Sequence, residues 1–361
     1  MAVHFHPLDI IEIKKETPDC VTLTFNVPPG LQEKFTFKEG QNITLKTSIN
    51  GEEVRRSYSL CAAPHEGKLK VAVKKVSGGI FSSFANENLQ VGDTIEVLPP
   101  TGNFFSREII NTSQRYLAIA AGSGITPVIS IIKESLHTNL SASFTLLYGN
   151  KNSDSIIFFD ELEDLKNRYM QRLQVIYVLS REHTEIPLQN GRIDAEKLAS
   201  LKNILSFKNY HEIFLCGPEE LIFTSRDFLL AEGIPASRIH FELFTIPGQA
   251  KSVVENKIEN ILTSDTGDHA QVTVKLDGRS FSFPLNYNGL NILDAALKQG
   301  ADLPYACKGG VCCTCKARLT SGEIIMDVNY ALEEEEVAAG YILTCQAHPR
   351  SPDVSIDFDI K

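Results

Sequence analysis

The chain has 361 residues, of which 43% are hydrophobic, and its formal net charge at pH 7 is −10. A chain of this length can form two or three domains with complete hydrophobic cores. The negative charge argues against nucleic-acid binding, which favours a basic surface. The N-terminus lacks a basic-then-apolar signal pattern, and no apolar run reaches the ~20 residues of a membrane span. We therefore expect a cytoplasmic protein that does not bind membranes.

Residues 1–108 contain short alternating strands separated by Gly, Pro and Asn, such as CVTLTFNV, QNITLKT and LKVAVKKV. This pattern predicts a small antiparallel β-barrel. One of its strands ends in Arg56, Tyr58 and Ser59. An arginine can bind a pyrophosphate through its charged fork, a tyrosine ring can lie against a flat ring system, and a serine can hydrogen-bond a ring nitrogen.

A second loop of the predicted barrel, Gly78–Ser83, places two glycines directly before an expected helix. Free backbone N–H groups at such a helix start favour an anion. Two anion-binding positions in one small barrel indicate a single phosphate-bearing cofactor. The alternative is two ordinary turns.

Residues 109–246 alternate apolar runs, among them YLAIAAG, SFTLLYGN and HEIFLCG, with helical stretches such as DELEDLKNRYM. This alternation predicts βαβ units around a parallel sheet. The loop Gly122–Pro127 follows the first strand and occupies the nucleotide-binding position, although it lacks the full G-x-G-x-x-G spacing. The segment Cys216-Gly217-Pro218 ends a later strand, so both loops are expected to open onto one crevice. For Cys216, the alternative to a place beside the cofactor is a buried structural role.

Two further strand ends in this domain carry candidate binding residues. Ser180 and Arg181 end one strand, and an arginine there can pair with the 2′-phosphate of NADPH. We therefore expect NADPH rather than NADH, with an exposed surface arginine as the alternative. Glu242 and Phe244 close the last strand, where Phe244 either belongs to the core or covers a flat cofactor.

Residues 247–267 are polar and predict an interdomain linker. In residues 268–361, two strands flank the turn Asp277-Gly278, and a short helix over Asn291–Gln299 precedes a cysteine-rich loop. This order is typical of a β-grasp ferredoxin-like α+β domain. The segment from Asp268 onward carries 13 acidic and 8 basic side chains, which either steer a basic partner or keep the surface solvated.

The four cysteines Cys307, Cys312, Cys315 and Cys345 follow the pattern C-x4-C-x2-C with a fourth cysteine far downstream. That spacing is typical of a plant-type [2Fe–2S] cluster. A structural zinc site is the alternative, but zinc loops usually pair C-x2-C knuckles. Cys313 breaks the spacing, so we interpret it as a packing residue rather than a ligand.

Taken in order, these motifs resemble the ferredoxin–NADP reductase superfamily fused to a plant-type ferredoxin domain. The stretches RRSYS, LAIAAGSGITP, ILDAALKQGADLPYACKGGVC and SIDFD further resemble the family of phenylacetyl-CoA epoxidase reductase subunits. The resemblance covers nearly the whole chain and is densest around the four cysteines. It departs at Phe244, where plant reductases end in Tyr.

The resemblance implies a role for each candidate residue. Those expected to bind FAD or the nicotinamide nucleotide are Arg56, Tyr58, Ser59, Gly79, Ser82, Gly122, Gly124, Thr126, Pro127, Ser180, Arg181, Gly217 and Pro218. Those expected to surround hydride transfer are Ser59, Cys216, Glu242 and Phe244, with Phe244 shielding the flavin.

A nicotinamide gives up two electrons as a hydride, whereas a [2Fe–2S] cluster accepts one electron, and a flavin can do both. We therefore expect electrons to pass from NADPH through FAD and the cluster to a partner oxygenase. By resemblance, the chain would be the reductase component of a multicomponent monooxygenase, and its partner the di-iron phenylacetyl-CoA epoxidase of phenylacetate catabolism. The alternatives are the reductase of another ring- or steroid-hydroxylating oxygenase, and a redox-responsive interaction subunit.

Overall fold

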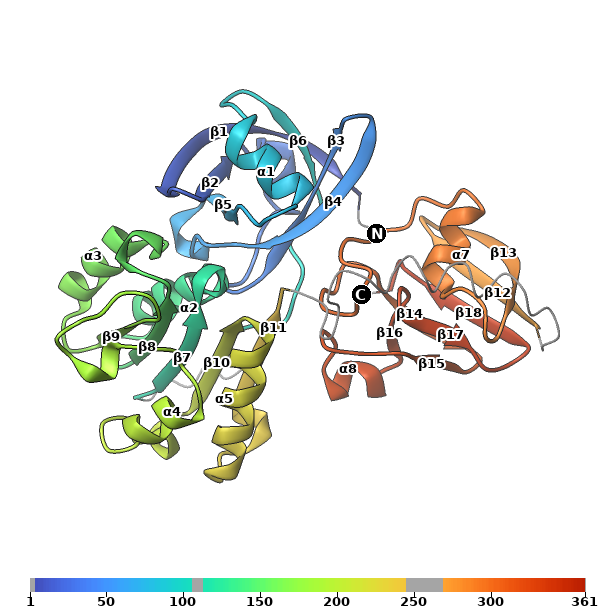
Figure 1. Cartoon of the computed structure of the whole chain (residues 1–361). Coiled ribbons are helices and arrows are strands. Elements are labelled where there is room, and N and C mark those ends of the chain that lie inside the picture. Colours follow the sequence, from blue (N-terminus) through green and yellow to red (C-terminus); the bar gives the residue numbers. More distant parts are fainter. Residues whose placement is uncertain (1–3, 106–112, 245–268, 361) are drawn as a thin grey trace. The chain divides into compact units, whose positions relative to one another are not determined.

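The computed structural model describes residues 4–105, 113–244 and 269–360 (Figure 1). Residues 6–54 and 58–244 form one compact unit, which contains two β-sheets. The residues from 269 onward belong to a second compact unit. The domain boundaries inferred from the sequence remain a prediction, and the expected linker, residues 247–267, lies outside the described residues.

The first sheet is antiparallel and has six strands in the order β4-β3-β6-β1-β2-β5. Its strands are β1 (His6–Thr17), β2 (Cys20–Phe25), β3 (Asn42–Ile49), β4 (Glu52–Ser59), β5 (Leu69–Lys74) and β6 (Thr94–Val97). An antiparallel bridge between Leu60, just after β4, and Val71 of β5 joins the two ends of this order. The sheet therefore closes on itself around a buried apolar interior, which confirms the predicted barrel. Helix α1 (Ile80–Glu87) follows β5.

The second sheet is parallel and has five strands in the order β11-β10-β7-β8-β9. Its strands are β7 (Arg115–Ala121), β8 (Ser143–Asn150), β9 (Leu173–Leu179), β10 (Glu212–Gly217) and β11 (Ile239–Leu243). The helices of this part are α2 (Ile125–Thr138), α3 (Phe159–Tyr169), α4 (Ala195–Leu201) and α5 (Glu219–Ala231). Strand β7 is almost entirely buried, as expected for a parallel sheet with helices on its faces.

The strand order of the parallel sheet reverses at β7. Strands β8 and β9 follow on one side of β7, and β10 and β11 lie on the other. Ligands of open α/β sheets bind at the carboxyl ends of the strands where the order reverses. The carboxyl ends of β7 and β10 meet there, and these are the ends that carry the Gly122–Pro127 loop and Cys216.

The C-terminal unit contains a mixed sheet in the order β13-β12-β18-β14-β16, with a two-stranded pair β15-β17. Its elements are β12 (His269–Leu276), β13 (Arg279–Asn286), α7 (Ile292–Lys298), β14 (Lys316–Ser321), β15 (Ile324–Met326), α8 (Glu334–Ala338), β16 (Tyr341–Leu343), β17 (Ala347–Pro349) and β18 (Asp353–Asp357). The expected hairpin and helix are both present. Asp277 and Gly278 have φ of 53° and 69°, as a two-residue hairpin turn requires. The Asn291 side chain caps α7 by accepting from the Asp294 N–H at 2.8 Å.

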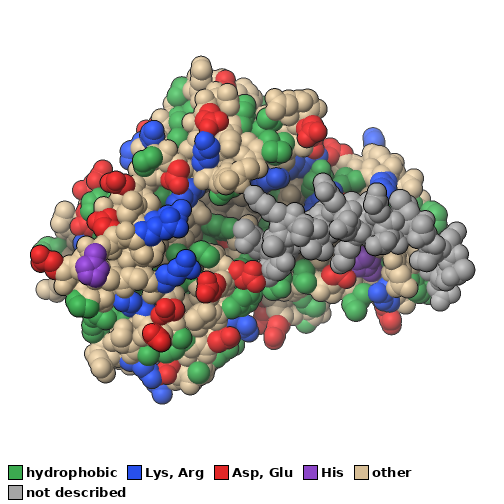
Figure 2. Space-filling view, in the orientation of Figure 1, with side chains coloured by type: hydrophobic (Ala, Val, Ile, Leu, Met, Phe, Trp, Pro, Cys, Tyr) green, Lys and Arg blue, Asp and Glu red, His purple; other side chains and the backbone are tan. Residues whose placement is uncertain are grey.

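Charges of both signs are mixed on the face of the molecule shown in Figure 2. Lys and Arg side chains lie there among Asp and Glu side chains. Among the residues that the structure describes, no helix is long and apolar enough to cross a membrane.

Candidate functional site

Three of the four residues expected around hydride transfer meet where β4, β10 and β11 end. The Ser59 hydroxyl donates to Glu242 Oε2 at 3.0 Å, although the two residues are 183 positions apart. Parallel pairing places Glu242 beside Cys216. Complete burial, and then the nearby Glu242 carboxylate, raise the pKa of the Cys216 thiol well above its ordinary value. The thiol is therefore neutral at physiological pH. Phe244 follows β11 and is 40% exposed.

The loop after β7 lies directly against the end of β10. A Cβ on Gly124 would collide with the Cys216 carbonyl and lie 2.8 Å from the Gly217 nitrogen, so only glycine fits. The Thr126 hydroxyl donates to the Ser123 carbonyl at 3.0 Å and holds the first turn of α2. Pro127 lies in that turn and is buried. The two loops that the sequence predicts to bind a nucleotide therefore pack directly against each other.

The two anion-binding positions predicted for the barrel also lie close together. The Tyr58 ring of β4 lies beside the Phe81 ring of α1, with centroids 5.5 Å apart. Helix α1 begins directly after Gly79, at which a Cβ would collide with the Ser82 hydroxyl. Ser82 accepts from the Val76 N–H at 3.2 Å and so closes the loop on itself. Arg56, on the same strand as Tyr58, is exposed. This grouping suits one phosphate-bearing cofactor.

Ser180 and Arg181 follow β9, at the same edge of the parallel sheet as Gly122. Backbone hydrogen bonds from the Ser180 and Arg181 N–H groups reach the Asn150 and Lys151 carbonyls at 2.9 and 2.8 Å. Both side chains are exposed, so the Arg181 guanidinium can reach solvent or a bound phosphate. Gly122 itself has φ of 54°, and its carbonyl accepts from the Tyr148 hydroxyl at 2.9 Å.

In the C-terminal unit the four expected ligand thiols form two pairs. The Cys312 thiol donates to Cys307 Sγ at 3.1 Å. Hydrogen bonding by the Cys312 thiol lowers the pKa of Cys307, and hydrogen bonding by Cys315 likewise lowers the pKa of Cys345. A cluster of two irons needs two thiolates on each iron, whereas zinc needs all its ligands around one point. Among the described residues, no group of three His, Cys, Asp or Glu side chains is arranged around a single ion. The residues present thus fit a two-iron cluster.

One backbone group and one side chain donate hydrogen bonds to sulfur atoms of the expected ligands. The Gly309 N–H donates to Cys307 Sγ at 3.3 Å, and the Gln346 side chain donates to Cys345 Sγ at 3.6 Å. Such donors stabilise thiolates and tune the potential of a cluster. A Cβ on Gly310, whose φ is 73°, would lie 3.0 Å from a methyl group of Val328. The Cys313 thiol donates instead to the Ala331 carbonyl at 3.3 Å, in agreement with a packing role.

One group of polar residues escaped the sequence analysis. Lys133 lies in α2 within the apolar stretch that precedes Leu136, and its ammonium contacts two carboxylates. The sequence offered one sign of this group, because a lysine within an apolar helical stretch is expected to need a partner of opposite charge. Its partners, Glu66 and Glu161, lie far from it in the chain and could not be predicted from the sequence.

Three family models match successive parts of the chain. The oxidoreductase FAD-binding domain matches residues 7–105, the oxidoreductase NAD-binding domain matches residues 118–227, and the 2Fe-2S iron-sulfur cluster binding domain matches residues 274–350.

Two curated relatives match over almost their whole length. A subunit of the 1,2-phenylacetyl-CoA epoxidase from Escherichia coli is 46% identical, covering 99% of this chain and 98% of the relative. The ferredoxin reductase component of 3-ketosteroid-9-alpha-monooxygenase from Rhodococcus rhodochrous is 34% identical, covering 97% and 96%.

Solved structures share the fold. Phthalate dioxygenase reductase, described as a modular structure for electron transfer from pyridine nucleotides to [2Fe–2S], has a TM-score of 0.57 at 24% identity, covering 98% of both chains. An intact type IV self-sufficient cytochrome P450 monooxygenase has a TM-score of 0.69 at 20% identity, and this chain spans 41% of that longer chain. With its FAD-binding barrel, parallel NAD-binding sheet and C-terminal 2Fe–2S domain, the chain belongs to the family of flavin and iron–sulfur reductase components of multicomponent oxygenases.

Proposed function

We propose that this chain is the NADPH-dependent reductase of a phenylacetyl-CoA epoxidase and supplies electrons to its di-iron oxygenase subunits. The observation that carries the proposal is the 46% identity to a component of that epoxidase, which extends over all three domains. The 34% identity to the steroid monooxygenase component makes another oxygenase the second candidate. Thiolate ligation of a cluster favours a reducing compartment, and the cytoplasm is the one we propose.

Within this reaction we assign the binding roles to the candidate residues that the sequence predicts. Arg56, Tyr58 and Ser59 hold FAD, with the loop at Gly79 and Ser82 on its pyrophosphate. When bound there, FAD would supply the chemistry that accepts a hydride and releases electrons one at a time. Hydride transfer requires the reacting atoms about 3–3.5 Å apart and aligned, so orientation is the main contribution of the protein.

The nucleotide side of the crevice is assigned in the same way. We assign the nicotinamide end of the nucleotide to the loop with Gly122, Gly124, Thr126 and Pro127 and to Gly217 and Pro218. We assign its 2′-phosphate to Ser180 and Arg181. The neutral Cys216 thiol and the Ser59–Glu242 hydrogen bond line the place of hydride transfer. Phe244 would shield the bound flavin. Cys307 and Cys312 would hold one iron of the cluster, and Cys315 and Cys345 would hold the other.

The partner is tested by reconstitution. The purified reductase is mixed with the oxygenase subunits of a phenylacetyl-CoA epoxidase or with a 3-ketosteroid 9α-monooxygenase, and substrate consumption per NADPH is measured. We expect tight coupling with the epoxidase and loss of NADPH without product in the steroid system. The reverse result would assign the chain to the second candidate. Reduction of cytochrome c, measured in parallel, shows whether the reductase itself is active.

A further inference from the structure

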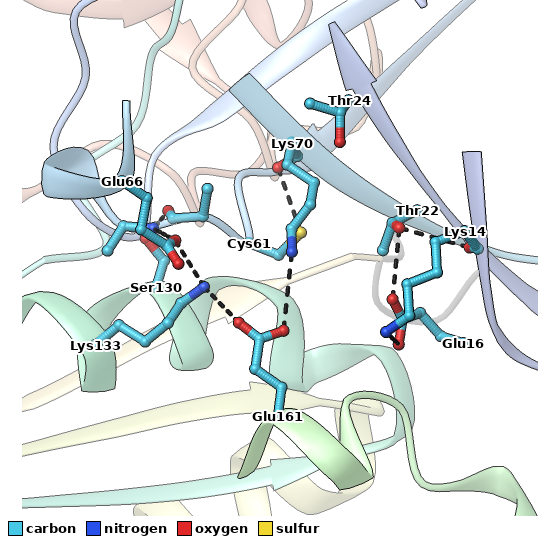
Figure 3. Close-up of polar contacts among 12 residues, drawn as sticks. Lys14, Glu16, Thr22, Thr24, Cys61, Glu66, Lys70, Ser130, Lys133 and Glu161 are labelled. Carbon is cyan, nitrogen blue, oxygen red and sulfur yellow. Dashed lines mark hydrogen bonds and ion pairs between the residues drawn. The ribbon is translucent and has the colours of Figure 1, made fainter. Parts of the chain in front are cut away.

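Helix α2 carries a buried lysine, Lys133, about two helical turns beyond the loop Gly122–Pro127, which we call the nicotinamide loop. The side chain of Lys133 is 5% exposed, and its ammonium lies 2.8 Å from Glu66 Oε2 and 2.8 Å from Glu161 Oε1 (Figure 3). Burial of an ammonium is costly unless opposite charges compensate it. Lys133 is therefore held between these two carboxylates.

The two carboxylates come from different domains. Glu66 belongs to a short 3-10 helix of the barrel, Pro64–Glu66, and also accepts from the Ala63 N–H at 2.6 Å. Glu161 belongs to α3 of the nucleotide domain, and Lys70 of β5 lies 3.8 Å from its second oxygen. We call Glu66, Lys70, Lys133 and Glu161 the interdomain cluster. Although burial by itself would raise the pKa of Glu66, the Lys133 ammonium lowers it below the ordinary value, so Glu66 is charged.

A second contact joins the same helix to the barrel. The Ser130 hydroxyl, one turn before Lys133, donates to the Ala62 carbonyl at 2.6 Å, and both residues are completely buried. Ala62 lies three positions after Ser59 in the chain. Helix α2 therefore begins at the nicotinamide loop, and its middle is hydrogen-bonded to the segment that follows β4, the proposed flavin-binding strand.

We propose that Lys133 is a positioning residue for hydride transfer, which ties helix α2 to the barrel through Glu66 and so sets the distance between nicotinamide and flavin. The inference rests on the reductase chemistry of the family and is independent of which oxygenase is the partner. A displacement of about 1 Å at the reacting atoms can cost 10²-fold in rate. Loss of the Lys133 bridge is therefore expected to affect the rate of hydride transfer more than nucleotide affinity, because the partners of the Lys133 ammonium, Glu66 and Glu161, are not among the residues that we propose to hold the nucleotide.

The test is stopped-flow reduction of the bound flavin by NADPH in the full-length holoprotein, without any oxygenase. In Lys133→Met, we expect the limiting rate to fall about 10- to 100-fold while the NADPH dissociation constant changes less than about twofold. FAD and iron content, and flavin reduction by dithionite, are expected to match the wild type. Lys133→Arg, which keeps the charge, is expected to recover most of the rate.

Lys166→Met is the matched control. The Lys166 ammonium pairs with Glu163 at 2.8 Å, and both residues lie on α3, so this ion pair does not join the two domains. We therefore expect the wild-type rate for Lys166→Met. If Lys133→Met does not fold, Lys133→Met combined with Glu161→Gln removes one charge of each sign and is measured in the same way. A wild-type limiting rate in Lys133→Met, or in the double variant where the single variant does not fold, would overturn the proposal. So would a loss that merely follows the FAD content, because that result indicates a stabilising role alone.

Discussion

At the scale of single residues, Cys345 and Cys313 provide a direct test of the cluster assignment. Cys345→Ser is expected to abolish the visible absorbance of the cluster, because Cys315 would then lack the partner thiolate on its iron. Flavin reduction by NADPH is expected to stay within about twofold of the wild type, because it precedes the cluster. Both quantities are read from the visible spectrum before and after addition of NADPH.

The control for this change is Cys313→Ser. The Cys313 thiol donates to the Ala331 carbonyl, and a serine hydroxyl can make the same hydrogen bond, so the cluster is expected to remain. Loss of the cluster in Cys313→Ser together with its retention in Cys345→Ser would show that the ligands are wrongly assigned.

Arg181 tests the proposed preference for NADPH. Its exposed guanidinium at the end of β9 is expected to contact only the 2′-phosphate, which NADH lacks. Arg181→Ala is expected to raise the KM for NADPH about 10-fold or more, with little change for NADH, since a hydrogen bond to a charged group contributes about 1.5–3 kcal/mol. Steady-state kinetics with both nucleotides measure this. Arg192→Ala, which removes another exposed arginine, serves as the control, and equal shifts for both nucleotides in Arg181→Ala would exclude the 2′-phosphate role.

At the scale of elements, the contact between the β7 loop and the end of β10 depends on the absence of a side chain at Gly124. Gly124→Ala is expected to push the loop away from the Cys216 carbonyl, which lowers the free energy of unfolding by about 1–3 kcal/mol and slows flavin reduction by NADPH. Denaturant unfolding and stopped-flow absorbance measure the two effects.

Gly30→Ala is the matched change, because a Cβ at Gly30 meets nothing within 4 Å. There we expect a neutral effect or a gain of about 0.4–1 kcal/mol from the less flexible unfolded chain. If Gly124→Ala behaves like Gly30→Ala, the close approach of the two loops is not important for activity.

At the same scale, the sequence predicted element types better than element contacts. The alternating runs before residue 108 and the apolar runs after residue 114 correctly indicated a barrel and a parallel sheet, because strand and helix periodicities are local properties. The turn at Asp277-Gly278 could also be predicted from local sequence, because few residue pairs adopt two successive positive φ angles. Lys133, in contrast, gave only the signal of a charge in an apolar helix, without its partners Glu66 and Glu161.

For the whole molecule, the electron capacity tests whether all cofactors reside in one chain. Titration of the purified protein with dithionite is expected to consume about three electrons, two for FAD and one for the cluster. The Cys345→Ser variant is expected to consume about two. Anaerobic titration followed in the visible range gives both numbers, and an uptake of two electrons by the wild type would contradict the cofactor content that the family implies.

The order of the FAD-binding, NAD-binding and 2Fe–2S parts, and the spacing of the four cysteines, could be predicted from the sequence alone. These features depend on short-range spacing, because Cys307, Cys312 and Cys315 lie in one loop whose length restricts where their sulfur atoms can be. Only the tertiary structure brought Ser59 to Glu242, Gly124 to Cys216 and Lys133 to Glu66. These contacts arise from strand order and from the packing of two domains within one unit, and neither is encoded in a local pattern.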